Sequence, residues 1–231
     1  MKCIIGGTSL LNSCCFAGWD EVSIETLYGH VHVRIKGRDA YIQRHGSPPS
    51  PPHLINHKAN IAALKQLGVG GVVSINSVGS LKTGLRPGTF VTPNDFFSLW
   101  NIPTLFDKEM KFIVPRMDEG IRAYLTDLCK EAKLNVRESG VYIQTTGPRL
   151  ETRAEVRFLK SLGDVVGMTM ASEATLCMEY EIPYASLCSV DNYCHGIAKV
   201  PLTMDEINDN CRRNLESIER VVRLMIGRNY V

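Results

Sequence analysis

The chain has 231 residues, of which 44% are hydrophobic and 22% are charged, and its formal net charge is +2. This composition is ordinary for a globular protein, and the length suits one α/β domain spanning residues 1–231. The small net charge gives no reason to expect nucleic acid or an anionic membrane as a partner. No apolar run reaches the roughly 18 residues of a membrane span. Gly6 interrupts the first apolar run too early for a leader, so a cytoplasmic protein is expected.

Predicted strands and one helix alternate through the first third of the chain. Short apolar runs predict strands at residues 3–5, 31–35, 40–43 and 71–75. Gly29 and Gly37 lie where hairpin-like turns are needed. The proline-rich residues 47–52 are too few for a domain linker and predict a stiff surface loop. An apolar stripe with helical spacing predicts a helix at about 54–67, which Gly68 ends.

The same alternation continues to the end of the chain. Strands are predicted at 89–92, 140–144, 165–168 and 184–190, with a further strand end at 93–95. Helices are predicted at 118–133, at 151–162, from Ser172, and at about 204–225. Thr203 is expected to cap the last helix, and Glu206 to complete a capping box. Because strands and helices alternate without an internal repeat, the sequence predicts a single α/β domain.

The eight cysteines are scattered and include no C-x-x-C pair, so no disulfide framework is expected. Cys188, Cys194 and His195 are the nearest approach to a set of zinc ligands. Their spacing matches no standard zinc site. No metal site is predicted.

Glycines and small polar residues gather where four of the predicted strands end. The segments are Gly6-Gly7-Thr8-Ser9, Arg44-His45-Gly46, Asn76-Ser77-Val78-Gly79 and the residue Thr169. Backbone N–H groups, hydroxyls and a guanidinium fork are all donors for an oxyanion. Each cluster alone is weak, because the glycine loop is neither a dinucleotide motif nor a P-loop and an Arg-His pair is more often a surface feature. Together the four segments predict a phosphate site.

Two further segments outline a pocket. Residues 145–152 (TTGPRLET) lead from a strand through a Gly-Pro turn to Glu151, which is expected in the first turn of a helix, where the helix dipole favours a carboxylate. Residues 166–174 (VGMTMASEA) end a strand just before another helix. Small ligands bind at such strand ends in α/β proteins.

These segments resemble the trimeric purine nucleoside phosphorylase and methylthioadenosine phosphorylase family. That family carries G-P-x-F-E-T and V-G-M-[ST]-x-x-P-E in this order, together with G-G-T-G-L, R-H-G and [NT]-[AS]-x-G-S-L segments. The resemblance covers nearly the whole chain from Ile4 to the last helix. It implies the nucleoside phosphorylase fold, in which helices flank a mixed, twisted central sheet. It also implies a homotrimer or a hexamer, although the chain is shorter than the family between residues 93 and 115, so subunit contacts are expected to differ.

The resemblance implies that inorganic phosphate is a co-substrate and that no cofactor or metal is needed. Carried over residue by residue, the phosphate ligands would be Thr8, Arg44, His45, Ser77 and Thr169. Ser9 is a departure, since the family usually has Gly there. A Cβ at this position restricts the loop backbone, but phosphate binding is still expected.

At the other end of the substrate, the resemblance implies that Glu151, Met168 and Asn192 bind the purine. Family members that cleave 6-oxopurine nucleosides carry the matching Glu and Asn, and those that cleave 6-aminopurine nucleosides carry Ser and Asp. A carboxylate accepts from the N1–H that hypoxanthine has, and an amide can donate to a purine that leaves with negative charge. Asp191 stands where the family usually has Ser or Thr, and the sequence suggests no role for it.

Met204 is expected to read the 5′ end of the sugar. Members that prefer ordinary nucleosides have a His at the matching helix start, whereas members that take methylthio-nucleosides have an apolar residue. Met204 therefore favours 5′-methylthioinosine as substrate, with methylthioadenosine and inosine or guanosine as alternatives. A nucleosidase that uses water, and a non-catalytic nucleoside sensor, are the other functions consistent with such a pocket.

Overall fold

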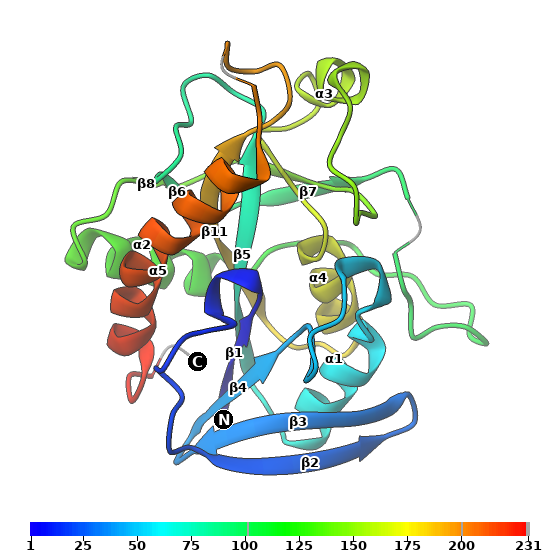
Figure 1. Cartoon of the computed structure of the whole chain (residues 1–231). Coiled ribbons are helices and arrows are strands. Elements are labelled where there is room, and N and C mark those ends of the chain that lie inside the picture. The colour runs from blue at the N-terminus through cyan, green and yellow to red at the C-terminus, as the bar shows by residue number, and fades with distance from the viewer. Residues whose placement is uncertain (101, 200, 230–231) are drawn as a thin grey trace.

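The computed structural model describes residues 1–100, 102–199 and 201–229, and eleven strands of this part of the chain form one mixed sheet (Figure 1). The strands are β1 (Lys2–Gly6), β2 (Asp20–Thr26), β3 (Gly29–Lys36), β4 (Asp39–Gln43), β5 (Gly71–Ser80), β6 (Phe90–Val91), β7 (Asp95–Ser98), β8 (Val136–Arg137), β9 (Val141–Gln144), β10 (Val165–Gly167) and β11 (Tyr184–Tyr193). The main strand order is β2-β3-β4-β1-β5-β10-β9-β7. β11 pairs with the other edge of β5 and also with β6, and β6 pairs with β8. The α/β class and the mixed central sheet are confirmed.

Five α-helices and two short 3₁₀ helices accompany this sheet in the described part of the chain. They are α1 (His57–Gln66), α2 (Glu119–Glu131), α3 (Arg153–Leu159), α4 (Met170–Glu179), α5 (Met204–Met225), η1 (Thr8–Leu10) and η2 (Pro52–Leu54). In Figure 1, α1 and α4 lie on one side of β5, and α2 and α5 lie on the other. None of these helices is both long and apolar enough to cross a membrane.

The central strands are buried on both faces, which explains their continuous apolar sequence. In β1, Cys3 and Ile5 pack into the core under α1 and α4, whereas Ile4 packs into the core under α2 and α5. Val72 and Val73 of β5 divide between the two cores in the same way. This alternation fixes the register, because a slip of one residue would exchange the two faces.

β5 changes partners along its length, and this change creates the place for a site. β1 pairs in parallel with Gly71–Ser74, while β10 pairs antiparallel with Gly79 and Ser80. Residues 75–78 of β5 therefore lie between the ends of two neighbouring strands. Gly6 ends β1 on one side of this gap, and β10 ends just before Thr169 on the other. A break of this kind in an α/β sheet is where ligands usually bind.

Most predicted elements are confirmed, with three omissions and several shifted boundaries, such as those of α1, β5 and α3. The sequence reading missed β2, β8 and the strand β7 that begins at Asp95. Thr203 caps α5 by accepting from the Glu206 N–H at 3.2 Å, as predicted. The helix predicted at 151–162 is shorter, since Thr152 is the N-cap of α3 and Glu155 completes the capping box. The expectation that Glu151 lies in the first helical turn is wrong, because Glu151 precedes the cap.

Candidate functional site

The first pair of predicted phosphate ligands comes together at the ends of β1 and β4. Thr8 Oγ1 of η1 lies 3.5 Å from His45 Nε2. His45 Nδ1 lies 2.8 Å from the Ser50 carbonyl oxygen, which can only accept, so Nδ1 carries the proton. Burial lowers the pKa of His45, and neighbouring Arg44 acts in the same direction. The ring is therefore neutral near pH 7, and Nε2 presents a lone pair toward Thr8.

Arg44 lies beneath this pair and is buried. Its Nε donates to Glu173 Oε1 at 2.5 Å, its Nη2 donates to Ser74 Oγ at 2.6 Å, and its Nη1 donates to the Ile75 carbonyl oxygen at 3.0 Å. The carboxylate of Glu173 raises the pKa of Arg44 against the effect of burial. Nη1 also packs so closely on Gly7 that a Cβ there would overlap with it. Arg44 thus supports the Gly6–Thr8 loop from inside.

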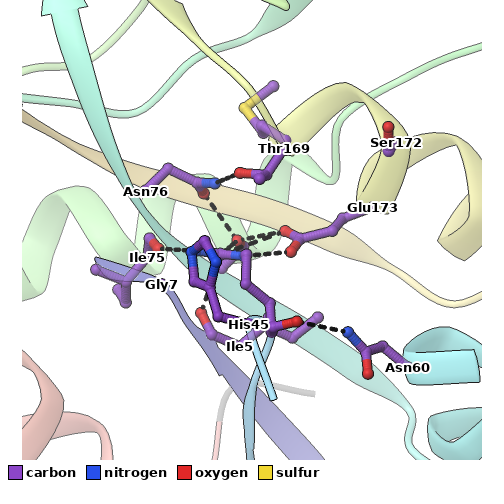
Figure 2. A network of polar contacts seen from close by, with 12 residues as sticks. Ile5, Gly7, His45, Asn60, Ile75, Asn76, Thr169, Ser172 and Glu173 are labelled. Carbon is purple, nitrogen blue, oxygen red and sulfur yellow. Dashed lines mark hydrogen bonds and ion pairs between the residues drawn. The ribbon is translucent and has the colours of Figure 1, made fainter. Parts of the chain in front are cut away.

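A second pair joins β5 to the start of α4. Asn76 Nδ2 donates to Thr169 Oγ1 at 2.9 Å, and Asn76 Oδ1 accepts from Ser74 Oγ at 2.7 Å. Since Ser74 Oγ also lies 2.6 Å from Glu173 Oε2, one hydrogen-bonded network runs from Arg44 to Thr169. Figure 2 shows Asn76, Thr169 and Glu173 of this network, with His45 close by. Thr169 accepts from Asn76 and so keeps its own hydroxyl proton for a ligand.

The N-terminal N–H groups of α4 are satisfied by side chains from β9. Tyr142 Oη accepts from the N–H groups of Thr169 at 3.2 Å and Met170 at 3.3 Å. Gln144 Oε1 accepts from the N–H groups of Ala171 at 2.8 Å and Ser172 at 3.2 Å. These contacts fix the helix start that carries Thr169, and they leave its hydroxyl, rather than the helix N-terminus, as the donor.

Ser77 is bound to Asp191 rather than open to the gap. Its hydroxyl donates to Asp191 Oδ2. Asp191 is fully buried in β11 at a bulge between Val190 and Asn192. The residue that the sequence left without a role therefore contacts a predicted phosphate ligand.

The purine-end residues lie around the turn before α3. Glu151 Oε1 accepts from Thr145 Oγ1 at 2.7 Å. Glu151 and Met204 line one cavity of about 280 Å³ together with Leu150, Thr152, Arg153, His195, Leu202 and Thr203. Met204 is 58% exposed, so its side chain does not pack in the core.

Met168 and Asn192 lie against two glycines. A Cβ at Gly147 would overlap with the Met168 sulfur, and the φ of +65° at Gly147 also favours glycine. Asn192 is buried, its Nδ2 donates to the Tyr193 carbonyl oxygen at 3.0 Å, and a Cβ at Gly79 would lie 3.2 Å from that nitrogen. Asn192 thus lies beside β5, whereas Glu151 and Met204 share the cavity near α3.

The sequence analysis named Asn76 only as part of its segment and missed two buried members of the network, Glu173 and Gln144. Both stand among mostly apolar neighbours. A polar residue in such a run is itself a signal, because a buried polar group needs partners. Among the described residues, no group of three or more His, Cys, Asp or Glu side chains is arranged to hold a metal ion.

Comparison with known proteins gives consistent matches over most of the chain. The model of the phosphorylase superfamily matches residues 21–227. A probable 6-oxopurine nucleoside phosphorylase from Archaeoglobus fulgidus is 39% identical over 95% of this chain and 95% of its own. A probable S-methyl-5′-thioinosine phosphorylase from Methanocaldococcus jannaschii is 40% identical over 97% of this chain and 91% of its own. Methylthioadenosine phosphorylase from Schistosoma mansoni, solved with adenine, has the same fold, with a TM-score of 0.86 at 22% identity over 100% of this chain and 93% of its own.

Proposed function

The chain belongs to the phosphorylase superfamily, and we propose that it cleaves purine nucleosides by phosphorolysis, with 5′-methylthioinosine as the preferred substrate. An oxygen of inorganic phosphate attacks C1′ of the sugar, and the bond from C1′ to the purine nitrogen breaks with its electron pair leaving on the base. The products are the free purine and a ribose 1-phosphate, which carries the methylthio group when the substrate does. The relatives named as 6-oxopurine and methylthioinosine phosphorylases support this choice.

The observation that carries the proposal is that two polar pairs lie beside β5, at the gap between the ends of β1 and β10. Thr8 with His45 lies at one side, and Asn76 with Thr169 lies at the other. The Thr169 hydroxyl, which keeps its proton, and the backbone N–H groups of the Gly6–Thr8 loop are donors that a phosphate could receive there. Arg44 belongs to this site as the residue that supports the Gly6–Thr8 loop, since Glu173 already balances its charge.

The substrate end is assigned from Glu151, Met168, Asn192 and Met204. The carboxylate of Glu151 accepts from N1–H of a 6-oxopurine, and the amide of Asn192 donates to the base as negative charge develops on it. Met204 meets the methylthio group from the start of α5, where a thioether contact needs no polar partner. Met168 packs on Gly147 and holds the turn that leads to Glu151.

We also propose that the active enzyme is a homotrimer or a hexamer. The irregular segment between β7 and α2 exposes Met110, Phe112 and Val114, which are 94%, 87% and 88% accessible. Three large apolar side chains so close in sequence are better explained by contact with a second copy of the chain than by exposure to solvent. A cytoplasmic location stays a prediction.

The test of substrate choice is a comparison of kcat/KM for four nucleosides with phosphate in excess. We expect methylthioinosine to lead methylthioadenosine because of Glu151 and Asn192, and to lead inosine because of Met204. One buried methylthio group should contribute about 1–3 kcal/mol to the second comparison. Adenosine should be the poorest of the four. If inosine equals methylthioinosine, Met204 does not select the substrate; if methylthioadenosine leads, the purine assignment is wrong.

A further inference from the structure

Asp191 is the centre of a buried polar cluster that the proposed reaction does not use. It is 0% exposed and occupies a bulge in β11, between residues that pair with Val78 and Gly79 of β5. Four donors converge on it. Oδ1 accepts from Ser189 Oγ at 2.7 Å and from Asn214 Nδ2 at 2.7 Å, and Oδ2 accepts from Ser77 Oγ and from Cys211 Sγ, the latter at 3.1 Å.

This set of donors matches an ionised carboxylate, which can only accept. Asn214 and Cys211 both belong to α5, so the cluster also holds that helix against β5 and β11. The consequence for Ser77 is chemical. A serine hydroxyl has one proton, and Ser77 donates that proton to Asp191. Its oxygen then presents only lone pairs to any other partner.

Ser77 follows Asn76 in the part of β5 that faces the gap between β1 and β10, where the proposed phosphate would lie. A lone pair facing a phosphate oxygen gives no hydrogen bond, and a buried carboxylate behind it repels a dianion. The Asn76–Thr169 pair has the opposite polarity, because Thr169 keeps its proton for a ligand. The hydroxyls of Ser77 and Thr169, which the sequence treats as equivalent, therefore differ: Thr169 can donate to phosphate and Ser77 cannot.

We infer that Asp191 withholds the Ser77 side chain from phosphate and keeps the affinity of the site for phosphate low. This inference rests on the proposed phosphorolysis. It makes Asp191 a residue that sets phosphate affinity through another residue, without contact with the substrate.

The first test is Asp191→Asn, which keeps the shape of the side chain. Oδ1 can still accept from Asn214 and Ser189, and the new Nδ2 takes the place of Oδ2 and donates to Ser77 Oγ. The charge is then gone and the Ser77 proton is free for phosphate. At saturating methylthioinosine, the KM for inorganic phosphate should fall by about threefold to tenfold, the range expected of one added hydrogen bond. Ser77→Ala in the Asp191→Asn background should reverse most of this gain.

Ser77→Ala in the wild type should raise the phosphate KM by less than about twofold, because the hydroxyl proton is already committed. The matched control is Asp39→Asn. Asp39 is also a buried carboxylate, and it lies 3.2 Å from Lys2 Nζ and accepts at 2.7 Å from the Gly227 N–H, just past the far end of α5. Its variant should keep the wild-type phosphate KM, and thermal unfolding of every variant shows which of them fold.

Three results would overturn the inference. Asp191→Asn could fold and leave the phosphate KM unchanged or raised. Asp39→Asn could lower the phosphate KM as much as Asp191→Asn does. Ser77→Ala alone could raise it about tenfold, the cost of a lost hydrogen bond to a charged ligand, and this arm decides even if Asp191→Asn does not fold. A wild-type rate independent of phosphate would instead contradict the proposed function itself.

Discussion

Arg44 and Glu173 form an ion pair with side chains only 2% and 1% exposed. The sequence predicted Arg44 as a phosphate ligand, whereas in the structure its buried guanidinium pairs with Glu173 and packs against Gly7. Truncating one member of a buried pair leaves the other charge without compensation, which costs more than the pair itself contributes.

Arg44→Ala should therefore lower the free energy of unfolding by about 3–5 kcal/mol, as well as raising the phosphate KM. Urea denaturation gives the first quantity. Arg137→Ala is the matched control, because Arg137 pairs with Asp164 at 3.2 Å while 43% exposed, and loss of such a pair should cost less than about 1 kcal/mol. Equal losses in the two variants would show that the Arg44 pair is not the stabilising contact inferred here.

His57 gives the stability a pH dependence. Burial lowers its pKa from 6.5 to about 4, and the Nδ1 atom has no hydrogen-bond partner among the residues that the structure describes. The unfolded chain therefore binds a proton between these two values that the folded chain does not bind. Stability is complete above pH 6.5 and is lost as the pH falls toward 4, by up to about 3 kcal/mol from this group. His57→Gln should flatten the decline of the unfolding free energy between pH 7 and 4.5, and parallel curves for the two proteins would contradict this assignment.

At the residue scale, the sequence could predict which polar residues lie at the strand ends but not where their protons point. Thr8, His45 and Thr169 were singled out because glycine and hydroxyl residues end strands in a recognisable pattern. Whether a hydroxyl donates inward or toward a ligand depends on its neighbour in space. For Ser77 that neighbour is Asp191, 114 positions along the chain.

At the scale of elements, α5 connects the proposed substrate cavity to the core. Its first residue, Met204, lines the cavity with Glu151, and its middle is held by Asp191 through Cys211 and Asn214. The N-cap Thr203 fixes where the helix begins. The backbone position of Met204 is thus fixed, as a contact that selects between substrates requires.

Met204→His should move substrate preference from methylthioinosine toward inosine. An imidazole can hydrogen-bond the 5′-hydroxyl, whereas a thioether substituent leaves that polar ring without a partner. The ratio of kcat/KM for the two substrates should change by about tenfold to a hundredfold, as one such contact allows. Phe158→His, on the exposed face of α3, is a control that adds the same group outside the lining of this cavity. An unchanged ratio in Met204→His would remove Met204 from the 5′ site.

The strands that the sequence did not predict bury little apolar surface. β2 is mostly exposed along its length and has only two apolar residues, Val22 and Ile24, so it contains no apolar run. β8 has only two residues. By contrast, β1, β5 and β11 are buried throughout and were found from their apolar runs. The start of α3 was misplaced because Glu151 and Glu155 are both carboxylates near a helix start, and only the geometry of Thr152 shows which one lies inside the helix.

At the scale of the whole molecule, the exposed apolar segment between β7 and α2 predicts self-association. Phe112→Ser combined with Met110→Ser should convert the oligomer to a single chain by light scattering, because these side chains are almost fully exposed in the isolated subunit. Leu27→Ser is the control, since Leu27 is 96% exposed at the tip of the β2–β3 hairpin. A monomeric wild type, or an oligomer that survives the double substitution, would contradict this interface.

The central claim is that phosphate, and not water, attacks the sugar. The most direct measurement supplies isotope-labelled inorganic phosphate with methylthioinosine and follows the label by mass spectrometry. We predict the label in methylthioribose 1-phosphate, formed in equal amount with free hypoxanthine and only when phosphate is present. Release of hypoxanthine with unlabelled free sugar, at a rate that does not depend on phosphate, would contradict the account.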